Sequence, residues 1–121
     1  MNKDLEKVLV EKYPTLYKDY RSKSPGACMR FGFECHDGWF KLIDDLSAKL
    51  SKFDIVASQV KEKFGGLRFY IGPCKIEDSD EVFGYIGEAE DLSLKTCEIC
   101  GNEGELQDQT HWLKVRCENC T

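Results

Sequence analysis

Two Cys-x-x-Cys pairs near the C-terminal end constrain the structure of this chain more than any other feature. The first pair is Cys97 and Cys100, the second is Cys117 and Cys120, and sixteen residues separate them. A two-residue gap allows both thiolates of a pair to face one point. Four thiolates about 2.3 Å from a common centre form a closed, structural zinc site. The spacing therefore predicts one structural zinc ion held by all four cysteines.

The segment between the two pairs favours a small hairpin. Residues 104–117, GELQDQTHWLKVRC, can form two short strands around a turn near residues 107–110, which would bring the second pair beside the first. Gly101 follows the first pair, where a loop of this kind often needs a positive φ. We expect His111 to lie within a strand, as a surface residue rather than a ligand.

Two rival interpretations of the cysteines stay open from the residues alone. One is iron in a rubredoxin-like site, although the closing residues CENCT lack the glycine-rich second loop expected there. The other is a dithiol redox pair, although a single active pair would not need a second one. Catalytic zinc normally has three protein ligands and an open position, so four cysteines favour a structural ion.

Composition and charge place the chain among small globular proteins. It has 121 residues, the size of one domain, with 41% hydrophobic and 32% charged residues. No apolar run approaches the roughly 20 residues that span a bilayer. The N-terminal sequence MNKDLEKVLVEKYP interleaves acids and bases, unlike a signal peptide. We therefore expect a cytoplasmic protein without membrane contacts, where cysteines serve as metal ligands more often than in disulfides.

The hydrophobic pattern predicts an α+β fold with helices packed on a β-hairpin. Apolar residues at helical spacing predict a helix before Pro14, a second over residues 37–53 with Asp37 as its cap, and a third over residues 79–93. The β-branched and aromatic residues of 54–72 predict the hairpin. Residues 22–27 have the composition of a loop. We expect residues 1–95 to form the helical and hairpin region, with a zinc-ribbon-like module at 96–121 packed on it as one compact unit.

The sequence VKEKFGGLRFY, residues 60–70, predicts how the hairpin strands pair. If Gly65 and Gly66 form a two-residue turn, Glu62 lies opposite Phe69 and Phe64 lies opposite Leu67. This register gathers the large apolar residues on one face. The other face would be a solvent-exposed surface available to a partner, formed by Lys61, Lys63, Arg68 and Tyr70. A three-residue turn is the rival, and it would pair Glu62 with Arg68.

Glu62 is the one charged residue that this register places on the apolar face. An unpaired carboxylate there is costly. We expect its side chain either to reach water at the sheet edge or to be held by a base or by backbone donors from residues 28–36, with Arg30 as the preferred base.

The residues expected in the core lie mainly on the second helix. Trp39 or Phe40, or both, should pack with Leu42, Ile43 and Leu46 against the hairpin and the third helix. Three cysteines lie outside the two pairs. With His36 they can be written as a second metal site, but their spacing matches no known ligand pattern, so burial is the preferred interpretation for Cys28, Cys35 and Cys74.

Four stretches together resemble a family of small bacterial and phage-encoded hypothetical proteins. They are RFGFECHDGWFKLIDDL (30–46), QVKEKFGGLRFYIG (59–72), EAEDLSLKTCEICGNEGEL (88–106) and the closing HWLKVRCENC. The resemblance covers roughly residues 28–121 and leaves the N-terminal 25 residues outside. It implies a KEKFGGLRFY-type hairpin followed by a four-cysteine zinc ribbon with Cys97, Cys100, Cys117 and Cys120 as ligands, and it implies no catalytic residue.

The uneven charge distribution bears on function. Residues 77–108 contain eleven acids and one base, whereas residues 1–76 contain fourteen bases and ten acids. We expect a protein-binding or regulatory module, one form of which is a phage protein acting on a host defence factor. Nucleic-acid binding is the alternative, because zinc ribbons and basic faces with an aromatic residue serve that purpose. Catalysis is the least favoured: His36 is the only candidate near neutral pH, and serine elbows and phosphate loops are missing.

Overall fold

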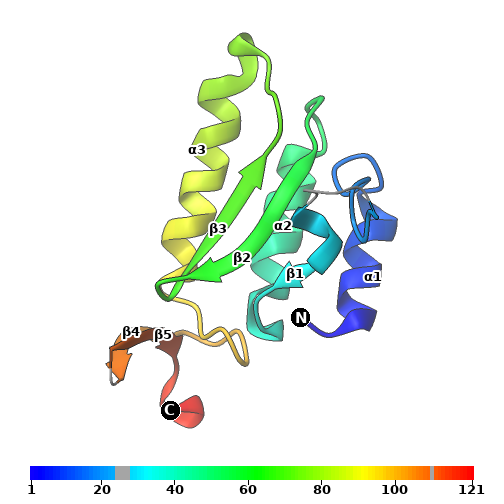
Figure 1. The fold of residues 1–121 in the computed structure, drawn as a ribbon. Coiled ribbons are helices and arrows are strands. Elements are labelled where there is room, and N and C mark those ends of the chain that lie inside the picture. Colours follow the sequence, from blue (N-terminus) through cyan, green and yellow to red (C-terminus); the bar gives the residue numbers. More distant parts are fainter. Residues whose placement is uncertain (24–27, 110) are drawn as a thin grey trace.

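A three-stranded sheet with helices on one face forms the larger part of the molecule. The computed structural model describes residues 1–23, 28–109 and 111–121. The strand order is β1-β2-β3, in which β1 (Phe33–Glu34) is parallel and β3 (Gly66–Ile71) antiparallel to the central β2 (Ala57–Lys63). Helices α2 (Phe40–Leu50) and α3 (Ile76–Ser93) lie side by side behind the sheet, and α1 (Lys3–Lys12) lies next to α2 (Figure 1). The fold is α+β, as the sequence predicts, although strand β1 was not expected.

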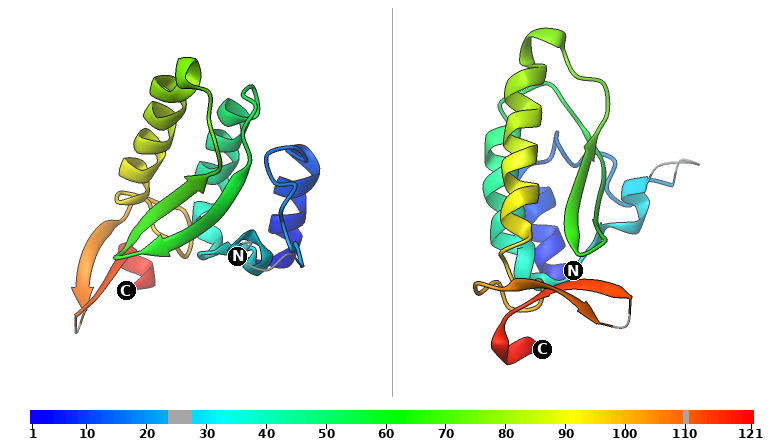
Figure 2. Two further views of the ribbon diagram at one scale, coloured as in Figure 1. Left: turned by 45° about the horizontal axis from the view of Figure 1, so that its top comes forward. Right: turned by 90° about the vertical axis from the view of Figure 1, so that its left-hand side faces the viewer.

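A second, two-stranded sheet follows α3 at one end of the molecule. It consists of β4 (Glu105–Gln109) and β5 (Trp112–Arg116), which pair antiparallel from Glu105 opposite Arg116 to Gln109 opposite Trp112. Short 3-10 helices lie at residues Cys28–Phe31, Asp37–Trp39 and Glu118–Cys120. The small sheet lies beneath the turn that joins β2 to β3 (Figure 2). The predicted loop at residues 22–27 falls largely on residues 24–27, outside the described residues.

The core lies between the larger sheet and its helices. Trp39 is fully buried, and its indole N–H donates to the carbonyl oxygen of Thr96 at 3.0 Å. Phe40 is half-buried against the same cluster. The three predicted aliphatic partners on the second helix are all buried: Leu42, Ile43 and Leu46. This part of the predicted core is therefore confirmed.

The predicted helix cap at Asp37 is wrong. Asp37 begins a 3-10 turn that precedes α2, and its Oδ1 accepts the backbone N–H of Asn2 at 2.6 Å. Trp39 occupies the position before the helix and makes no side-chain cap bond. Asp37 thus joins the N-terminal segment to the start of α2 instead of capping that helix.

The β2–β3 hairpin turns one residue earlier than predicted. Lys63 pairs with Gly66 and Glu62 with Leu67, so Phe64 and Gly65 are the two turn residues, with φ of 54° and 86°. Two-residue hairpins favour such positive φ values at both positions. When the turn moves by one residue, each residue of β2 pairs with a residue two positions away from the predicted one on β3. Because side chains alternate between faces, every side chain stays on its predicted face. Leu67 is accordingly buried, as predicted, whereas Phe64 lies on the turn with 67% of its surface exposed.

The Glu62 carboxylate and two backbone N–H groups on the outer edge of β3 form hydrogen bonds with nearby groups. The Oε2 atom of Glu62 accepts the N–H of Gly65 at 2.7 Å, so the turn itself, and not Arg30, holds this carboxylate. On the outer edge of β3, the N–H of Leu67 donates to Ser93 Oγ at 2.9 Å and the N–H of Phe69 donates to Glu90 Oε2 at 3.1 Å. Side chains of α3 therefore occupy backbone donors that would otherwise offer a pairing edge.

Candidate metal centre

The first cysteine pair lies on a tight loop that follows α3. The N–H of Cys97 donates to Asn102 O at 2.7 Å, and the N–H of Gly101 donates to Cys97 O at 2.9 Å. Gly101 has φ of 84°, the left-handed conformation predicted for it. The second pair begins where β5 ends, and there the N–H of Cys120 donates to Cys117 O at 3.2 Å. Each pair is therefore folded back on itself by its own backbone.

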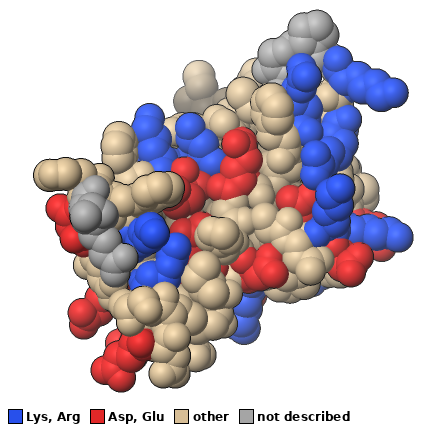
Figure 3. All heavy atoms as spheres, turned by 60° about the horizontal axis from the view of Figure 1, so that its bottom comes forward, with Lys and Arg blue, Asp and Glu red and all other residues tan. Residues whose placement is uncertain are grey.

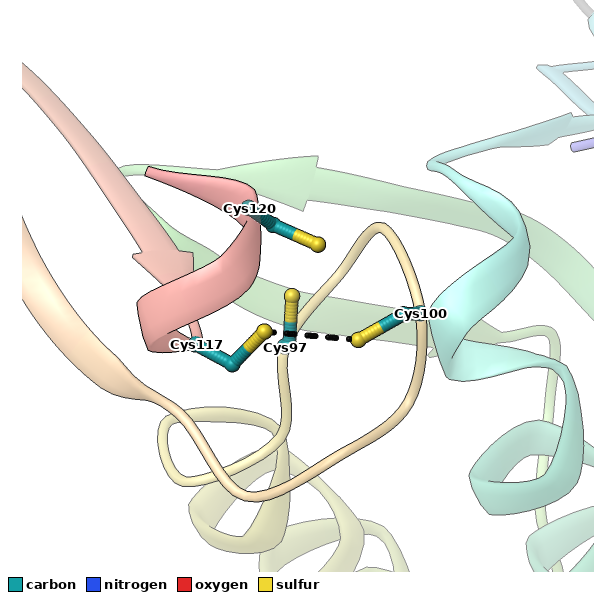
Figure 4. Close-up of side chains that lie close together, drawn as sticks. All are labelled: Cys97, Cys100, Cys117 and Cys120. Atoms are coloured by element: carbon teal, nitrogen blue, oxygen red, sulfur yellow. Dashed lines mark hydrogen bonds between the residues drawn. The ribbon is translucent and has the colours of Figure 1, made fainter.

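The β4–β5 hairpin brings the two loops together. All four cysteine Sγ atoms lie within 4.8 Å of one another and point toward a common centre (Figure 4). The Sγ atoms of Cys100 and Cys117 are 3.5 Å apart. Four sulfurs bound tetrahedrally at about 2.3 Å would be about 3.8 Å apart. The spacing thus fits a metal ion, and the four cysteines can hold one.

The ionisation of the sulfurs depends on their neighbours. Burial opposes ionisation of Cys97, but its sulfur accepts hydrogen bonds from backbone N–H groups, that of Cys100 foremost, and its pKa falls to about 6. For Cys100 the N–H of Asn102 favours the thiolate, yet the neighbouring sulfurs raise the pKa overall. The thiol of Cys117 raises the pKa of Cys120 to about 12. Thiolates this close repel one another, and a bound cation offsets that repulsion.

Glu98, inside the first pair, ties the loop to the larger sheet. Its side chain is buried, and its Oε2 accepts the N–H of His36 at 3.0 Å. Its Oε1 lies 3.5 Å from Nη1 of Arg116, and its backbone oxygen accepts the N–H of Gly38 at 2.7 Å. A buried carboxylate with these partners is stable, whereas loss of one partner would be costly. No sequence pattern indicates this role, because Glu98 resembles the other acids of residues 77–108.

Gly38 allows the cysteine loop to approach the start of α2. A Cβ at Gly38 would lie 2.2 Å from Cys97 O and 2.5 Å from the carbonyl carbon of Glu98. Conversely, a Cβ at Gly101 would lie 3.0 Å from Gly38 O. Backbone therefore meets backbone at this junction, and any side chain at position 38 would separate the two parts.

The structure places the other candidate ligands apart from this centre. Cys35 is buried, Cys74 is half-buried, and Cys28 is exposed, so burial was correctly predicted only for the first of them. His36 is exposed and contributes only its backbone N–H to Glu98. His111 lies on the turn between β4 and β5 with φ of 66°, not within a strand. Across residues 1–23, 28–109 and 111–121, the four paired cysteines are the one group of potential ligands close enough to share an ion.

The hairpin residues singled out as a partner surface share one face of the sheet. Lys61 lies opposite Arg68, Gln59 lies opposite Tyr70, and Lys63 ends the strand. Helices α2 and α3 cover the other face, while none of the helices α1, α2 and α3 lies over this outer face of β2 and β3 (Figure 1 and Figure 2). The residues lie together as predicted.

Comparisons of the chain with protein-family models, with curated proteins and with solved structures found no match. Among the described residues, no helix has both the length and the apolar character needed to cross a membrane. The cysteine cluster and the outer sheet face are therefore the features of the described residues that bear on function.

Proposed function

We propose that the four cysteines hold one structural zinc ion. Tetrahedral four-thiolate coordination closes the ion to substrate and water, which suits a structural role. The N–H groups directed at the Cys97 sulfur favour the thiolate that zinc requires. In this role the ion stabilises the loop that carries Glu98 and keeps the β4–β5 hairpin against the larger sheet.

We further propose that the protein is a binding module whose outer sheet face docks on an acidic region of a protein partner. The observation that carries this proposal is the arrangement of Lys61 directly opposite Arg68 on the uncovered face. Like charges directly opposite one another destabilise a sheet. In the described part of the chain, neither residue forms an ion pair, nor does the adjacent Lys63. Glu34 of β1 is the neighbour of Lys61 on its other side and offsets part of this repulsion. Carboxylates of a partner would offset the rest at Arg68 and Lys63.

Nucleic-acid binding is the second candidate, favoured by the presence of Tyr70 among the cations, since bases stack on aromatic rings. The charge distribution favours a protein. Binding to phosphate backbones needs a continuous row of cations. Figure 3 shows one run of Lys and Arg side chains along one side of the view, and acidic side chains separate this run from the smaller basic groups on the same face.

A matched pair of charge-reversal variants tests the proposal. Lys61→Glu with Arg68→Glu alters the outer sheet face, and Lys3→Glu with Lys52→Glu makes the same change in net charge at exposed positions elsewhere. Cross-linking in cells followed by mass spectrometry should recover protein partners with wild type and the control, and lose them with the sheet-face variant. Equal recovery with all three proteins would contradict the proposal. Binding of a labelled thymidine oligonucleotide that weakens steeply between 50 and 200 mM salt and is lost in the sheet-face variant would support the second candidate.

A further inference from the structure

The tips of the two hairpins converge to form a pocket outside the metal centre. At the β2–β3 turn, a Cβ at Gly65 would lie 2.6 Å from Cδ1 of Leu106 and 3.3 Å from the carbonyl carbon of Leu113. Beside this contact is an open pocket of about 280 Å³. It is lined by Glu62, Phe64, His111, Trp112 and Leu113. Two segments nearly 50 residues apart in the sequence therefore build one concave site whose lining combines two aromatic side chains with polar groups.

Two of the pocket residues have a backbone conformation that costs free energy. Phe64 has φ of 54° and His111 has φ of 66°, both in the left-handed region. This conformation costs roughly 1–2 kcal/mol for most residues other than glycine, asparagine and aspartate. Asn or Gly is the usual choice at the first position of such a turn. Strain of this kind is frequent at binding sites.

Packing within the chain does not account for the choice of Phe64. The Phe64 side chain is 67% exposed, and across the pocket Trp112 is 64% exposed. A buried aromatic side chain could offset the strain through its contacts, but these rings contact mainly solvent. A small polar residue at position 64 would suit the turn better, so the aromatic ring there is best explained by something that covers it.

The charges around the pocket indicate the chemistry of that occupant. Lys63 Nζ lies 5.4 Å from the centre of the Phe64 ring, and Lys114 Nζ lies 4.8 Å from the centre of the Trp112 ring. Neither lysine forms an ion pair with any described residue. The one lining carboxylate, Glu62, already accepts the N–H of Gly65. The pocket thus offers two aromatic walls, each with a separate cation.

We propose that this pocket receives the apolar anchor side chain of an acidic segment in a partner protein. This proposal rests on the proposed protein-binding function. The anchor is an aromatic or large aliphatic side chain that lies between the Phe64 and Trp112 rings, and carboxylates of the partner on either side of it pair with Lys63 and Lys114. Two isolated cations match two carboxylates. A nucleic-acid strand would bring further phosphates against the acidic residues of β4, which include Glu105 and Asp108. Buried aromatic anchors commonly contribute most of the binding free energy of an interface.

The variant Phe64→Asn separates binding from stability. Asn tolerates the left-handed conformation, so this variant should melt at the wild-type temperature or above. The probe is a synthetic twelve-residue peptide of Asp and Glu with one central Phe, compared with the same peptide carrying Ala and with a twelve-residue thymidine oligonucleotide. Binding is measured by amide chemical shifts of the isotope-labelled, zinc-loaded protein and by Trp112 fluorescence.

We expect the Phe peptide to shift the amides of residues 63–65 and 112–114. Its dissociation constant should rise about tenfold for the Ala peptide and again for Phe64→Asn, which corresponds to about 1.4 kcal/mol. Equal binding of both peptides, unchanged binding by Phe64→Asn, no binding at millimolar peptide, or preferential binding of the oligonucleotide would each overturn the pocket proposal. The variant Lys61→Glu with Arg68→Glu distinguishes the two proposals: if it binds the Phe peptide as wild type does while Phe64→Asn does not, the pocket stands and the sheet face is wrong.

Discussion

The larger sheet with its helices and the small C-terminal sheet hold their structures by different means. The first has a continuous core in which Leu9, Trp39, Ile43, Leu50 and Val60 are fully buried. In residues 96–121, the buried hydrophobic side chains among those described are Val115 and two of the cysteines. A segment this short cannot remove enough apolar surface from water to offset the entropy of ordering its chain. In our proposal, metal coordination takes the place of a core in the second region.

The two regions nevertheless meet through backbone contacts that a flexible linker would lack. Glu98 and Gly38 connect the cysteine loop to the start of α2, and the Trp39 indole donates to Thr96. The proposed ion would therefore stabilise both the small sheet itself and its contact with the larger region. A substitution that destabilises one region should therefore also change the amide signals of the residues that contact it in the other region.

Loss of a metal ligand should have the largest effect. Structural zinc contributes an apparent free energy of roughly 10–16 kcal/mol to the folding of zinc-finger peptides at neutral pH. Cys97→Ser should therefore abolish zinc binding and unfold the small sheet, measured by elemental analysis and by loss of dispersed amide signals from residues 96–121. Cys74→Ser, outside the centre, is the control and should retain one zinc per chain. Zinc retained by the Cys97 variant would contradict the ligand assignment.

Removal of the central core ring should come second and act on the larger region. Trp39 is fully buried, so Trp39→Ala should lower the free energy of unfolding by about 3–5 kcal/mol, measured by denaturant unfolding of the zinc-loaded protein. Trp112→Ala removes a ring that is 64% exposed and should change that free energy by about 0.5 kcal/mol or less. Similar losses in the two variants would mean that the core is not centred where the structure places it.

A methyl group at the junction should have an intermediate effect. Gly38→Ala would force a Cβ against the carbonyl groups of Cys97 and Glu98, at a cost of about 1–3 kcal/mol, with amide shift changes at residues 97–101. Gly84→Ala is the matched control, since a Cβ there meets no atom within 4 Å. In a helix interior that change should stabilise the protein by about 0.5–1 kcal/mol. A neutral Gly38→Ala would show that the two regions are not in close contact.

The contact between α1 and α2 should give the smallest effect. Lys12 Nζ lies 2.8 Å from Asp44 Oδ1, with 48% and 22% of the two side chains exposed. Partial burial opposes ionisation of Asp44, but Lys12 and Tyr13 outweigh it and hold its pKa below the usual value. The contribution is therefore present above about pH 4 and is lost as pH falls through the lowered pKa. Asp44→Asn should lower the free energy of unfolding by about 1 kcal/mol or less at pH 7. It should also reduce the dependence of that free energy on pH below about pH 4, and an unchanged pH dependence would contradict this assignment.

Periodicity and cysteine spacing predict much of this structure, because both act locally. The helical apolar pattern around Trp39 and the two-residue gap within each cysteine pair can both be recognised from residues that are close together in the sequence. The sequence also predicts which residues lie on each face of the β2–β3 hairpin, because a shift of the turn by one residue leaves every side chain on the same face. The position of the turn was not predictable, because either Phe64–Gly65 or Gly65–Gly66 can form a two-residue turn, and the structure around it includes contacts between distant segments such as Gly66 and Leu94.

The remaining features depend on contacts that no local pattern encodes. Strand β1 is two residues long and exists only because β2 lies beside it. The carboxylates of Glu90 and Glu98 accept backbone N–H groups, yet in the sequence they resemble the other acids of residues 77–108. The pocket between the hairpin tips likewise joins segments whose proximity follows from the tertiary fold. The four clustered cysteines were therefore predictable from the sequence, whereas the residues that hold their loops in place were not.

Hydrogen exchange before and after metal chelation tests the central contrast most directly. The experiment compares amide protection of the zinc-loaded protein with that of the same sample after removal of the ion by a strong chelator. We predict complete loss of protection in residues 96–121 together with persistent protection of β2, β3 and α3, reduced only near Gly38 and Trp39. Unchanged protection of residues 96–121, or simultaneous loss of protection in β2, β3 and α3, would contradict the account that one region is built on metal and the other on its core.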